Sequence, residues 1–434
     1  MVQRRLLSGA VLFLATFVPV GLAAQPAPTP SEPPADEMQS SQPAEAPGAT
    51  APPPGDPAPL LDVESVPPAE TPPVAAAAPV KFSPFKVESP TATLKLGLLA
   101  QPQYEAVGSS NPAIQRVSQN LFMRRIRFLV GGTLFEDFEY FFETDFADLL
   151  KAGPDGVKST PGMNVQDAFV TWKAAGDLLK VDVGYLLPPL AHNALQGATT
   201  LLSWDYFANS FRHSNAFFTS ANPIGRDTGV QLRGLLLDGR LEYRVGAFQG
   251  RRSPPSPTDM PTLAPSRNTF RVAARLQLNL LEPESGFFYA GTYLGAKSIL
   301  SVGASYDFQE TYEYWAADAF LDLPLGPGTL TAQINVATWD GADWLPALPD
   351  QRAVMAEAGF TFKAPAFGPV VRFEHRDIAE QSATAPDERR LGGGIALWPY
   401  GHNINLKAFY TRVEPTPDLA SYDQFNVQWQ FFFF

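Results

Sequence analysis

The feature that most constrains this sequence is an alternation of apolar and polar residues with a period of two, which recurs from Thr93 onward. Between positions 300 and 308, for example, Leu, Val, Ala, Tyr and Phe occupy the even positions, and Ser, Gly, Ser and Asp occupy the odd ones. Successive side chains of a β-strand point to opposite faces, so each such segment has one apolar and one polar face. The sequence therefore predicts an all-β protein.

The length and number of these segments favour a membrane barrel over a soluble sandwich. Most have about 10 to 14 residues, close to the roughly 9 to 11 that a tilted membrane strand needs and longer than the usual 5 or 6 of globular sheets. An even number of long strands can close into a barrel, which leaves no exposed edge. We therefore predict a sixteen-stranded antiparallel transmembrane β-barrel over 93–434. The sixteen segments are 93–105, 121–135, 137–148, 164–174, 178–185, 226–236, 240–250, 269–280, 297–308, 311–322, 328–340, 353–365, 368–378, 389–398, 402–414 and 422–434.

The connections give an independent check, because outer-membrane barrels have long loops at one end and short turns at the other. The odd-numbered connections are mostly long and the even-numbered ones mostly short. Two connections depart from this rule: 281–296 is long where a turn is expected, and Gln309–Glu310 is short where a loop is expected. The strand register around 281–311 is therefore left open by the sequence.

The first 92 residues differ from the rest in composition. Residues 1–23 have Arg4 and Arg5, an apolar run too short to span a membrane, and small residues at Gly21 and Ala23, which is the pattern of a cleaved signal peptide. Of the 43 prolines, 19 fall between positions 25 and 92. Such a segment buries too little apolar surface to fold, so 24–92 is predicted to be a disordered Pro/Ala-rich spacer in the periplasm. It is either a tether or a solvated tail.

Composition also argues against several classes of function. The chain has no cysteine, which excludes disulfides and thiolate sites, and only four histidines. A net charge of -12 argues against nucleic acid as a partner. There is no Gly-x-Ser-x-Gly motif, and the histidines have no recognisable nucleophile around them. We expect no enzyme activity, no cofactor and no bound metal.

Three stretches resemble a known family. These are Leu-Phe-Met-Arg-Arg-Ile-Arg-Phe at 121–128, Gly-Gly-Thr at 131–133 and Glu-Tyr-Phe-Phe-Glu-Thr-Asp-Phe at 139–146. They are similar to the second and third strands of the phosphate-selective porin O and P family, and a looser similarity covers most of 93–434. The resemblance implies a trimeric, water-filled outer-membrane porin whose constriction is lined by arginines that favour phosphate.

The predicted lumen face carries twelve basic and twelve acidic residues, which cancel. We therefore expect only a modest anion or phosphate preference, and one alternative is that most of these charges pair across neighbouring strands. The family motif covers Arg124 as well, but alternation turns Arg124 towards lipid unless it lies near the interface or at a bulge. The candidates for pore lining and anion binding are Arg125, Arg127, Arg233, Arg244, Arg275, Arg372 and Arg376.

The longest connection, about 186–226, is the candidate for the constriction loop because it is too aromatic for a freely solvated tip. Its candidate residues are Trp204, Asp205, Arg212 and His213. The loop either folds into the barrel or packs over a neighbour in a trimer. Aromatic residues near strand ends, such as Trp172, Tyr289, Trp339, Trp398 and Tyr400, suggest interface girdles.

Together these observations predict an outer-membrane porin, a channel for passive diffusion of small ions and solutes. The expected partners are outer-membrane lipid, small inorganic ions including phosphate, and two further copies in a homotrimer. Two alternatives remain open from the sequence: an outer-membrane barrel enzyme, and a structural barrel with a plugged lumen.

Overall fold

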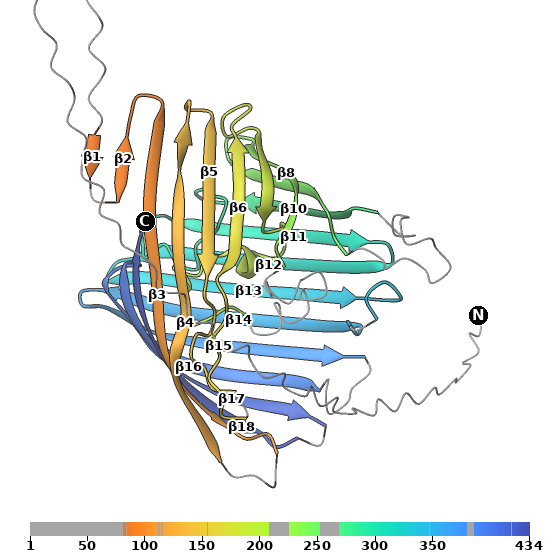
Figure 1. The fold of residues 1–434 in the computed structure, drawn as a ribbon. Coiled ribbons are helices and arrows are strands. Elements are labelled where there is room, and N and C mark those ends of the chain that lie inside the picture. Colours follow the sequence, from red (N-terminus) through yellow and green to blue (C-terminus); the bar gives the residue numbers. More distant parts are fainter. Residues whose placement is uncertain are drawn as a thin grey trace, which may run out of the picture. The chain divides into compact units, whose positions relative to one another are not determined.

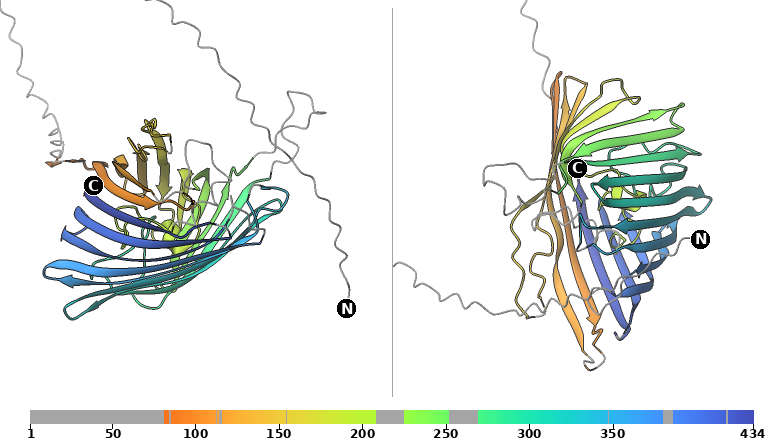
Figure 2. Two further views of the ribbon diagram at one scale, coloured as in Figure 1. Left: turned by 90° about the horizontal axis from the view of Figure 1, so that it is seen from below. Right: turned by 90° about the vertical axis from the view of Figure 1, so that its right-hand side faces the viewer.

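The structure is a computed structural model that describes residues 81–83, 85–111, 113, 116–153, 155–207, 225–251, 269–346, 348–379, 386–417 and 419–434. Sixteen long strands, β3 to β18, form one closed antiparallel barrel (Figures 1 and 2). Each strand pairs with the next along the chain, and β18 pairs with β3 to close the ring. The predicted sixteen-stranded barrel is confirmed.

The strands and the one helix have the following bounds: β1 Lys81–Ser83, β2 Lys86–Glu88, β3 Ala92–Gly108, β4 Val117–Leu134, β5 Phe138–Asp145, β6 Asn164–Trp172, β7 Lys180–Leu186, α1 His192–Leu195, β8 Asp227–Leu236, β9 Leu241–Phe248, β10 Arg271–Asn279, β11 Ile299–Gln309, β12 Tyr312–Leu325, β13 Gly328–Asp340, β14 Gln351–Lys363, β15 Ala366–Ile378, β16 Asp387–Tyr400, β17 Ile404–Thr416 and β18 Tyr422–Phe433.

The register that the sequence left open is now fixed. Strands β10 and β11 pair from Val272↔Phe308 to Asn279↔Ser301, so the whole of 280–298 is the connection between them. Strands β11 and β12 are joined by the tight turn at 310–311, where Glu310 has a positive φ of 56°. The two exceptions to the loop-length rule are therefore real features of the barrel.

A short hairpin precedes the barrel within the segment that the sequence assigned to the spacer. Strand β1 pairs with β2, and β2 pairs with the start of β3 through Lys86↔Lys95. The ring of Phe85 lies 4.2 Å from that of Phe433, between centroids. The first strand thus begins at Lys81, twelve residues before the expected start of the barrel at Thr93. The predicted signal peptide and the spacer up to position 80 lie outside the described residues.

The two faces of the wall differ as the alternation requires. Outward side chains such as Leu121, Phe128 and Val183 are apolar and exposed, whereas inward ones such as Gln101 and Gln231 are polar and buried. An apolar exterior and a polar lumen are the signature of a membrane barrel. Among the described residues, no helix is long and apolar enough to cross a membrane.

The girdle prediction was correct only in part. Trp172 and Tyr400 are exposed on the outside, at 47% and 70% of their surface. Trp339 and Trp398 are buried, as is Tyr289, which belongs to the 280–298 connection. A residue's distance from a strand end does not decide its face; its parity along the strand does.

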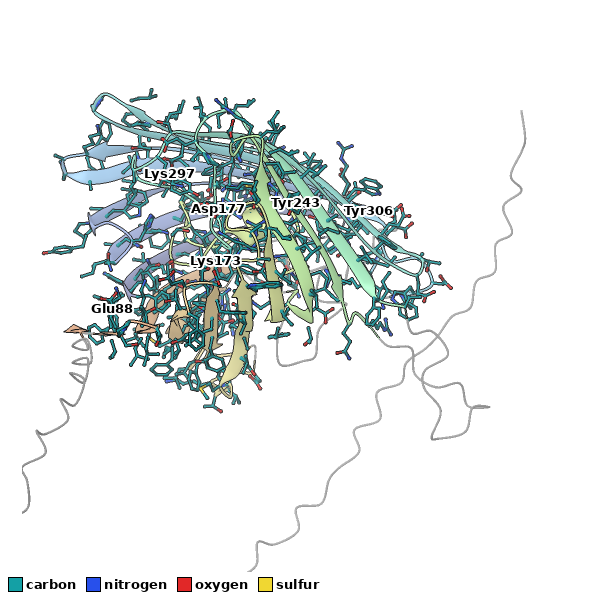
Figure 3. All side chains as sticks on the ribbon, turned by 90° about the horizontal axis from the view of Figure 1, so that it is seen from above. Glu88, Lys173, Asp177, Tyr243, Lys297 and Tyr306 are labelled. Atoms are coloured by element: carbon teal, nitrogen blue, oxygen red, sulfur yellow. The ribbon has the colours of Figure 1, made fainter. Side chains whose placement is uncertain are left out.

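The barrel has a loop end, which carries the odd-numbered connections, and a turn end, which carries the even-numbered ones. Strand β3 begins at the turn end and β18 ends there, as the pair Leu98↔Phe433 shows. Figure 3 labels Glu88, Lys173, Asp177 and Lys297, which belong to this end and come from three parts of the chain, because Lys173 and Asp177 share the turn between β6 and β7.

Candidate functional site: the barrel lumen

A β-bulge on β4 turns two consecutive arginines towards the same carboxylate. Gln101 pairs with Arg125, but the next residue, Pro102, pairs with Met123, so Arg124 is the extra residue. Proline lacks an N–H for the strand ladder, and a bulge accommodates that loss. Arg124, which simple alternation would turn to lipid, is therefore redirected inward.

Asp205 accepts hydrogen bonds from both arginines and connects the longest loop to the wall. Its carboxylate oxygens lie 2.6 Å from Arg125 Nη2 and 3.0 Å from Arg124 Nε. Burial alone would raise the pKa of Asp205, but the two guanidinium groups outweigh burial and hold this pKa below its ordinary value. Asp205, a predicted constriction residue, is thus a charged anchor of the loop.

Arg127 is paired within the wall. Its side chain lies 3.0 Å from both Glu143 and Asp145 on the neighbouring strand β5. Arg125 and Arg127 are therefore each engaged by carboxylates, and an incoming phosphate would have to compete with them. Buried pairs of this kind neutralise charge and leave little excess field.

The other arginine candidates face oxygen atoms as well. The contacts are Arg233 Nε to Asp182 at 2.8 Å, Arg244 Nε to Glu242 at 2.7 Å, Arg275 Nη1 to Asp318 at 2.6 Å, Arg372 Nη2 to Glu374 at 2.6 Å and Arg376 Nη2 to the carbonyl oxygen of Pro386 at 2.9 Å. Most of these arginines are thus paired with carboxylates, but only the Arg233 pair joins neighbouring strands, while the Arg244 and Arg372 pairs each lie within one strand. Sequence reasoning missed Arg226, which lies 2.9 Å from Asp167, because it stands where the loop meets β8.

Residues 187–207 of the longest connection lie inside the barrel, and we call them the inward loop. It contains the short helix α1 and packs against strands β12 to β14 through an apolar cluster. The cluster includes Leu190 and Phe207 from the loop and Tyr314, Trp339 and Met355 from the wall. Polar contacts fix the same surface: the His192 N–H donates to Asp318 and the Asn193 N–H to Asn335.

Beyond helix α1, the inward loop reaches the strands on the other side of β14. Lys407 Nζ donates to the carbonyl oxygens of Leu201 and Ser203, at 2.5 and 2.9 Å. Trp204 packs against the cluster formed by Leu202 and residues of β15 to β17. Of the four predicted constriction residues, Trp204 and Asp205 are therefore within the lumen, and Arg212 and His213 lie outside the described residues.

A second segment enters the lumen from the opposite end. Residues 280–298, which we call the turn-end segment, place Glu284 and Tyr289 in the buried interior. Glu284 lies 2.9 Å from His192 Nε2, and the imidazole of His192 stacks between the rings of Tyr289 and Phe320. Burial would raise the pKa of Glu284, but His192, Tyr293 and Gln277 outweigh it and lower this pKa.

The length of this segment is evident from the sequence, but the sequence alone predicted no function for it. Its aromatic run, Phe287, Phe288 and Tyr289, was the available signal, because a solvated turn has no need of three consecutive aromatic rings. The rings pack inward, with Phe287 4.4 Å from Phe169 and Phe288 5.9 Å from Phe141, between centroids.

Among the described residues, two adjoining cavities lie between the inward segments and the wall. One, of about 350 Å³, is lined by Arg127, Glu143, Arg226 and Tyr206. The other, of about 510 Å³, lies towards the turn end and is lined by Lys95, Lys180, Arg233 and Phe169. Both share Phe141, Ser285, Gly286, Phe288 and Phe434 as lining residues. Among the described residues, no three His, Asp or Glu side chains are placed to hold a metal ion.

Comparison with known proteins agrees with this geometry. Residues 101–234 match the family model of phosphate-selective porin O and P, which confirms the resemblance inferred from the sequence. The match covers 134 of the 434 residues, from β3 to β8, and supports the resemblance over that part of the chain. No curated protein matches the chain.

Solved structures share the fold at low sequence identity. An anion-selective porin from Comamonas acidovorans aligns with a TM-score of 0.52 and 12% identity, over 79% of this chain and all of that one. OmpF of Salmonella typhi, in complex with daunomycin, aligns with a TM-score of 0.52 and 13% identity, over 80% of this chain and all of that one. The outer-membrane channel DcaP of Acinetobacter baumannii aligns with a TM-score of 0.50 and 11% identity, over 80% of this chain and 99% of that one. These similarities establish the barrel fold.

Proposed function

We propose that the chain is a porin of the bacterial outer membrane, and that it conducts small inorganic ions and small polar solutes with weak selectivity, including at most a modest preference for anions or phosphate. The observation that carries the proposal is the pairing of lumen arginines with carboxylates, of which Arg125 with Asp205 and Arg127 with Glu143 are two examples. A wall whose charges compensate one another keeps water and ions in the lumen but produces little net field.

Reversal potentials in planar bilayers test this selectivity. A tenfold KCl gradient gives about 59 mV for an ideally selective pore. We expect less than about half of that value, and phosphate should reduce chloride current only at millimolar concentrations or above. A reversal potential near the ideal value, or block by micromolar phosphate, would contradict the proposal.

The arginine candidates on β4 are open to a direct test. In the double variant Arg125→Ala with Arg127→Ala, we expect the anion preference to decrease, because both guanidinium groups face the lumen. Arg389→Ala is a matched control, since Arg389 is exposed and its contact with Glu414 is long, at 3.9 Å. Equal effects of the double variant and the control would show that the two lumen arginines do not set the preference.

We also propose that the porin is a homotrimer and that 24–80 extends into the periplasm, as the family resemblance implies. Trimers should insert as triplets of equal conductance steps, and crosslinking in detergent should give a band of three chains. The chain has no native cysteine, so a single cysteine in the spacer reports its side of the membrane. Labelling of intact cells by an impermeant reagent would place the spacer outside and refute this arrangement.

A further inference from the structure

The inward loop and the turn-end segment meet inside the barrel and are joined backbone to backbone. The N–H of Tyr289 donates to the Leu195 carbonyl at 3.0 Å, and the N–H of Gly197 donates to the Tyr289 carbonyl at 2.9 Å. Three residues further on, the Thr292 N–H donates to the Thr200 carbonyl at 3.1 Å. These bonds connect segments from opposite ends of the barrel into one body, which we call the partition.

The partition is sealed against the wall on the side of β11 to β17. Ala353 and Met355 on β14 have no exposed surface beneath the inward loop. Ser305 on β11 is 3% exposed, and its hydroxyl donates to the Leu190 carbonyl at 3.0 Å. Apolar packing in these clusters leaves little space for water between the described part of the inward loop and this surface.

The side of β4 to β6 is different, because both cavities lie there. The smaller cavity is bounded by Arg127 and Glu143 on the wall and by residues of both partition segments, including Thr199 and Ser285. Arg226 also lines it, and its Nη1 is buried without a hydrogen-bond partner among the described residues. An unpartnered guanidinium N–H beside a cavity is a position where water or an anion would be bound favourably.

We propose that the partition confines permeation to a one-sided route along β4 to β6, where Arg127, Glu143, Phe141, Arg226 and Ser285 determine which solutes pass. This inference rests on the proposed channel function. Solutes cross between ion pairs on the wall and the phenylalanine rings of the turn-end segment, so small hydrated ions pass and bulky polar solutes are rejected. The turn-end segment is thereby a second selectivity element beside the inward loop.

Cysteine accessibility tests the route cleanly because the native chain has no cysteine. Ser285→Cys places a thiol at an exposed position that lines both cavities. Ser305→Cys is the matched control: it makes the same substitution on the sealed side. Ser301→Cys, at a position 1% exposed on the same strand, is a second control in case the Ser305 variant folds poorly.

Each folded variant is treated with charged methanethiosulfonate reagents, one carrying a sulfonate and one a trimethylammonium group. The thiolate displaces the sulfinate leaving group and forms a mixed disulfide, so the side chain gains one charge of the chosen sign. Mass spectrometry should find Ser285→Cys labelled in the folded barrel, and the two controls labelled only after unfolding. Labelling at Ser285→Cys should lower the single-channel current by at least half and shift the reversal potential in opposite directions for the two reagents.

The results separate the route from the channel function itself. Rapid labelling of the folded Ser305→Cys and Ser301→Cys variants, with block of current, would overturn the one-sided route while leaving the channel in place. So would a labelled Ser285→Cys channel whose current and reversal potential do not change. If the wild-type protein conducts nothing but the labelling pattern is as expected, the partition is a plug, and both the route and the proposed function fail.

Discussion

Replacing Asp205 by Asn should release the inward loop from the wall. Asp205 is the shared partner of Arg124 and Arg125, at 3.0 and 2.6 Å. The side chains of Asp205 and Arg125 are 13% and 2% exposed, so loss of the carboxylate leaves a buried guanidinium without its counter-charge. Breaking a buried pair costs about 3–5 kcal/mol, whereas exposed pairs contribute about 0–1 kcal/mol.

The expected size of the effect lies at the low end of the buried range. Arg124 is 25% exposed and retains Asp148, 3.3 Å away, so we expect a loss of about 3 kcal/mol. At about 1.4 kcal/mol per factor of ten, this shifts the ratio of seated to unseated loop by roughly 100-fold. The substitution also removes one negative charge, so it raises the net charge of the lumen by one unit.

Single-channel recording measures both consequences. The Asp205→Asn channel should show frequent current fluctuations with larger maximal steps, and its reversal potential should shift towards anion selectivity. Asp148→Asn is the control, because it makes the same change in charge and also removes a partner of Arg124, but at a position 43% exposed. Quiet, wild-type steps with an unchanged reversal potential in Asp205→Asn would refute the assigned anchoring role.

Three further predictions concern packing, acidity and the strand wall. Leu345→Ala, at a residue with no exposed surface in the cluster beneath the inward loop, should destabilise the barrel by about 2–5 kcal/mol, seen as a lower unfolding temperature in detergent. The lowered pKa values of Asp205 and Glu284 mean that their stabilisation is present above the ordinary carboxylate pKa and is lost only as pH falls through the lowered values. Current fluctuations caused by release of the inward loop should therefore not increase between pH 7 and about 4.5, and an increase between pH 5 and 6 would contradict this assignment. Gly394→Ala should lower the unfolding temperature more than Gly393→Ala, because an added Cβ would lie 2.2 Å from the Ala408 carbonyl oxygen at the first site and 3.6 Å from the nearest atom at the second; equal effects would show that β16 and β17 separate easily.

The barrel was predictable because alternation and strand length act at every position of the wall. All sixteen strands appear where the period-two segments lie. One side of each strand faces lipid and the other faces water, so apolar and polar residues must alternate along it. Arg127 and Arg233, which this rule assigns to the inner face, are buried in the structure. The rule placed Arg124 only conditionally, because a bulge depends on pairing with Pro102 in another strand.

The interior of the barrel was less predictable because its contacts are made between segments far apart in sequence. His192 and Glu284 are in contact although they are 92 residues apart in the sequence, and no local sequence pattern predicts that contact. Similarly, Trp339 and Trp398 were assigned to girdles from their place near strand ends, but they pack inward beneath the inward loop or beside it. The aromatic content of 287–289 was visible in the sequence, but only the fold shows that these rings pack into the lumen, as Phe287 does against Phe169.

The most direct test of this account is the single-channel conductance of a variant in which residues 284–293 are replaced by a Gly-Ser linker of equal length. The account predicts that wild-type protein conducts and that the variant conducts with a clearly larger step, because the partition loses its half from the turn end while β10 and β11 remain paired. A variant whose step equals that of the wild type would contradict the claim that the turn-end segment narrows this channel.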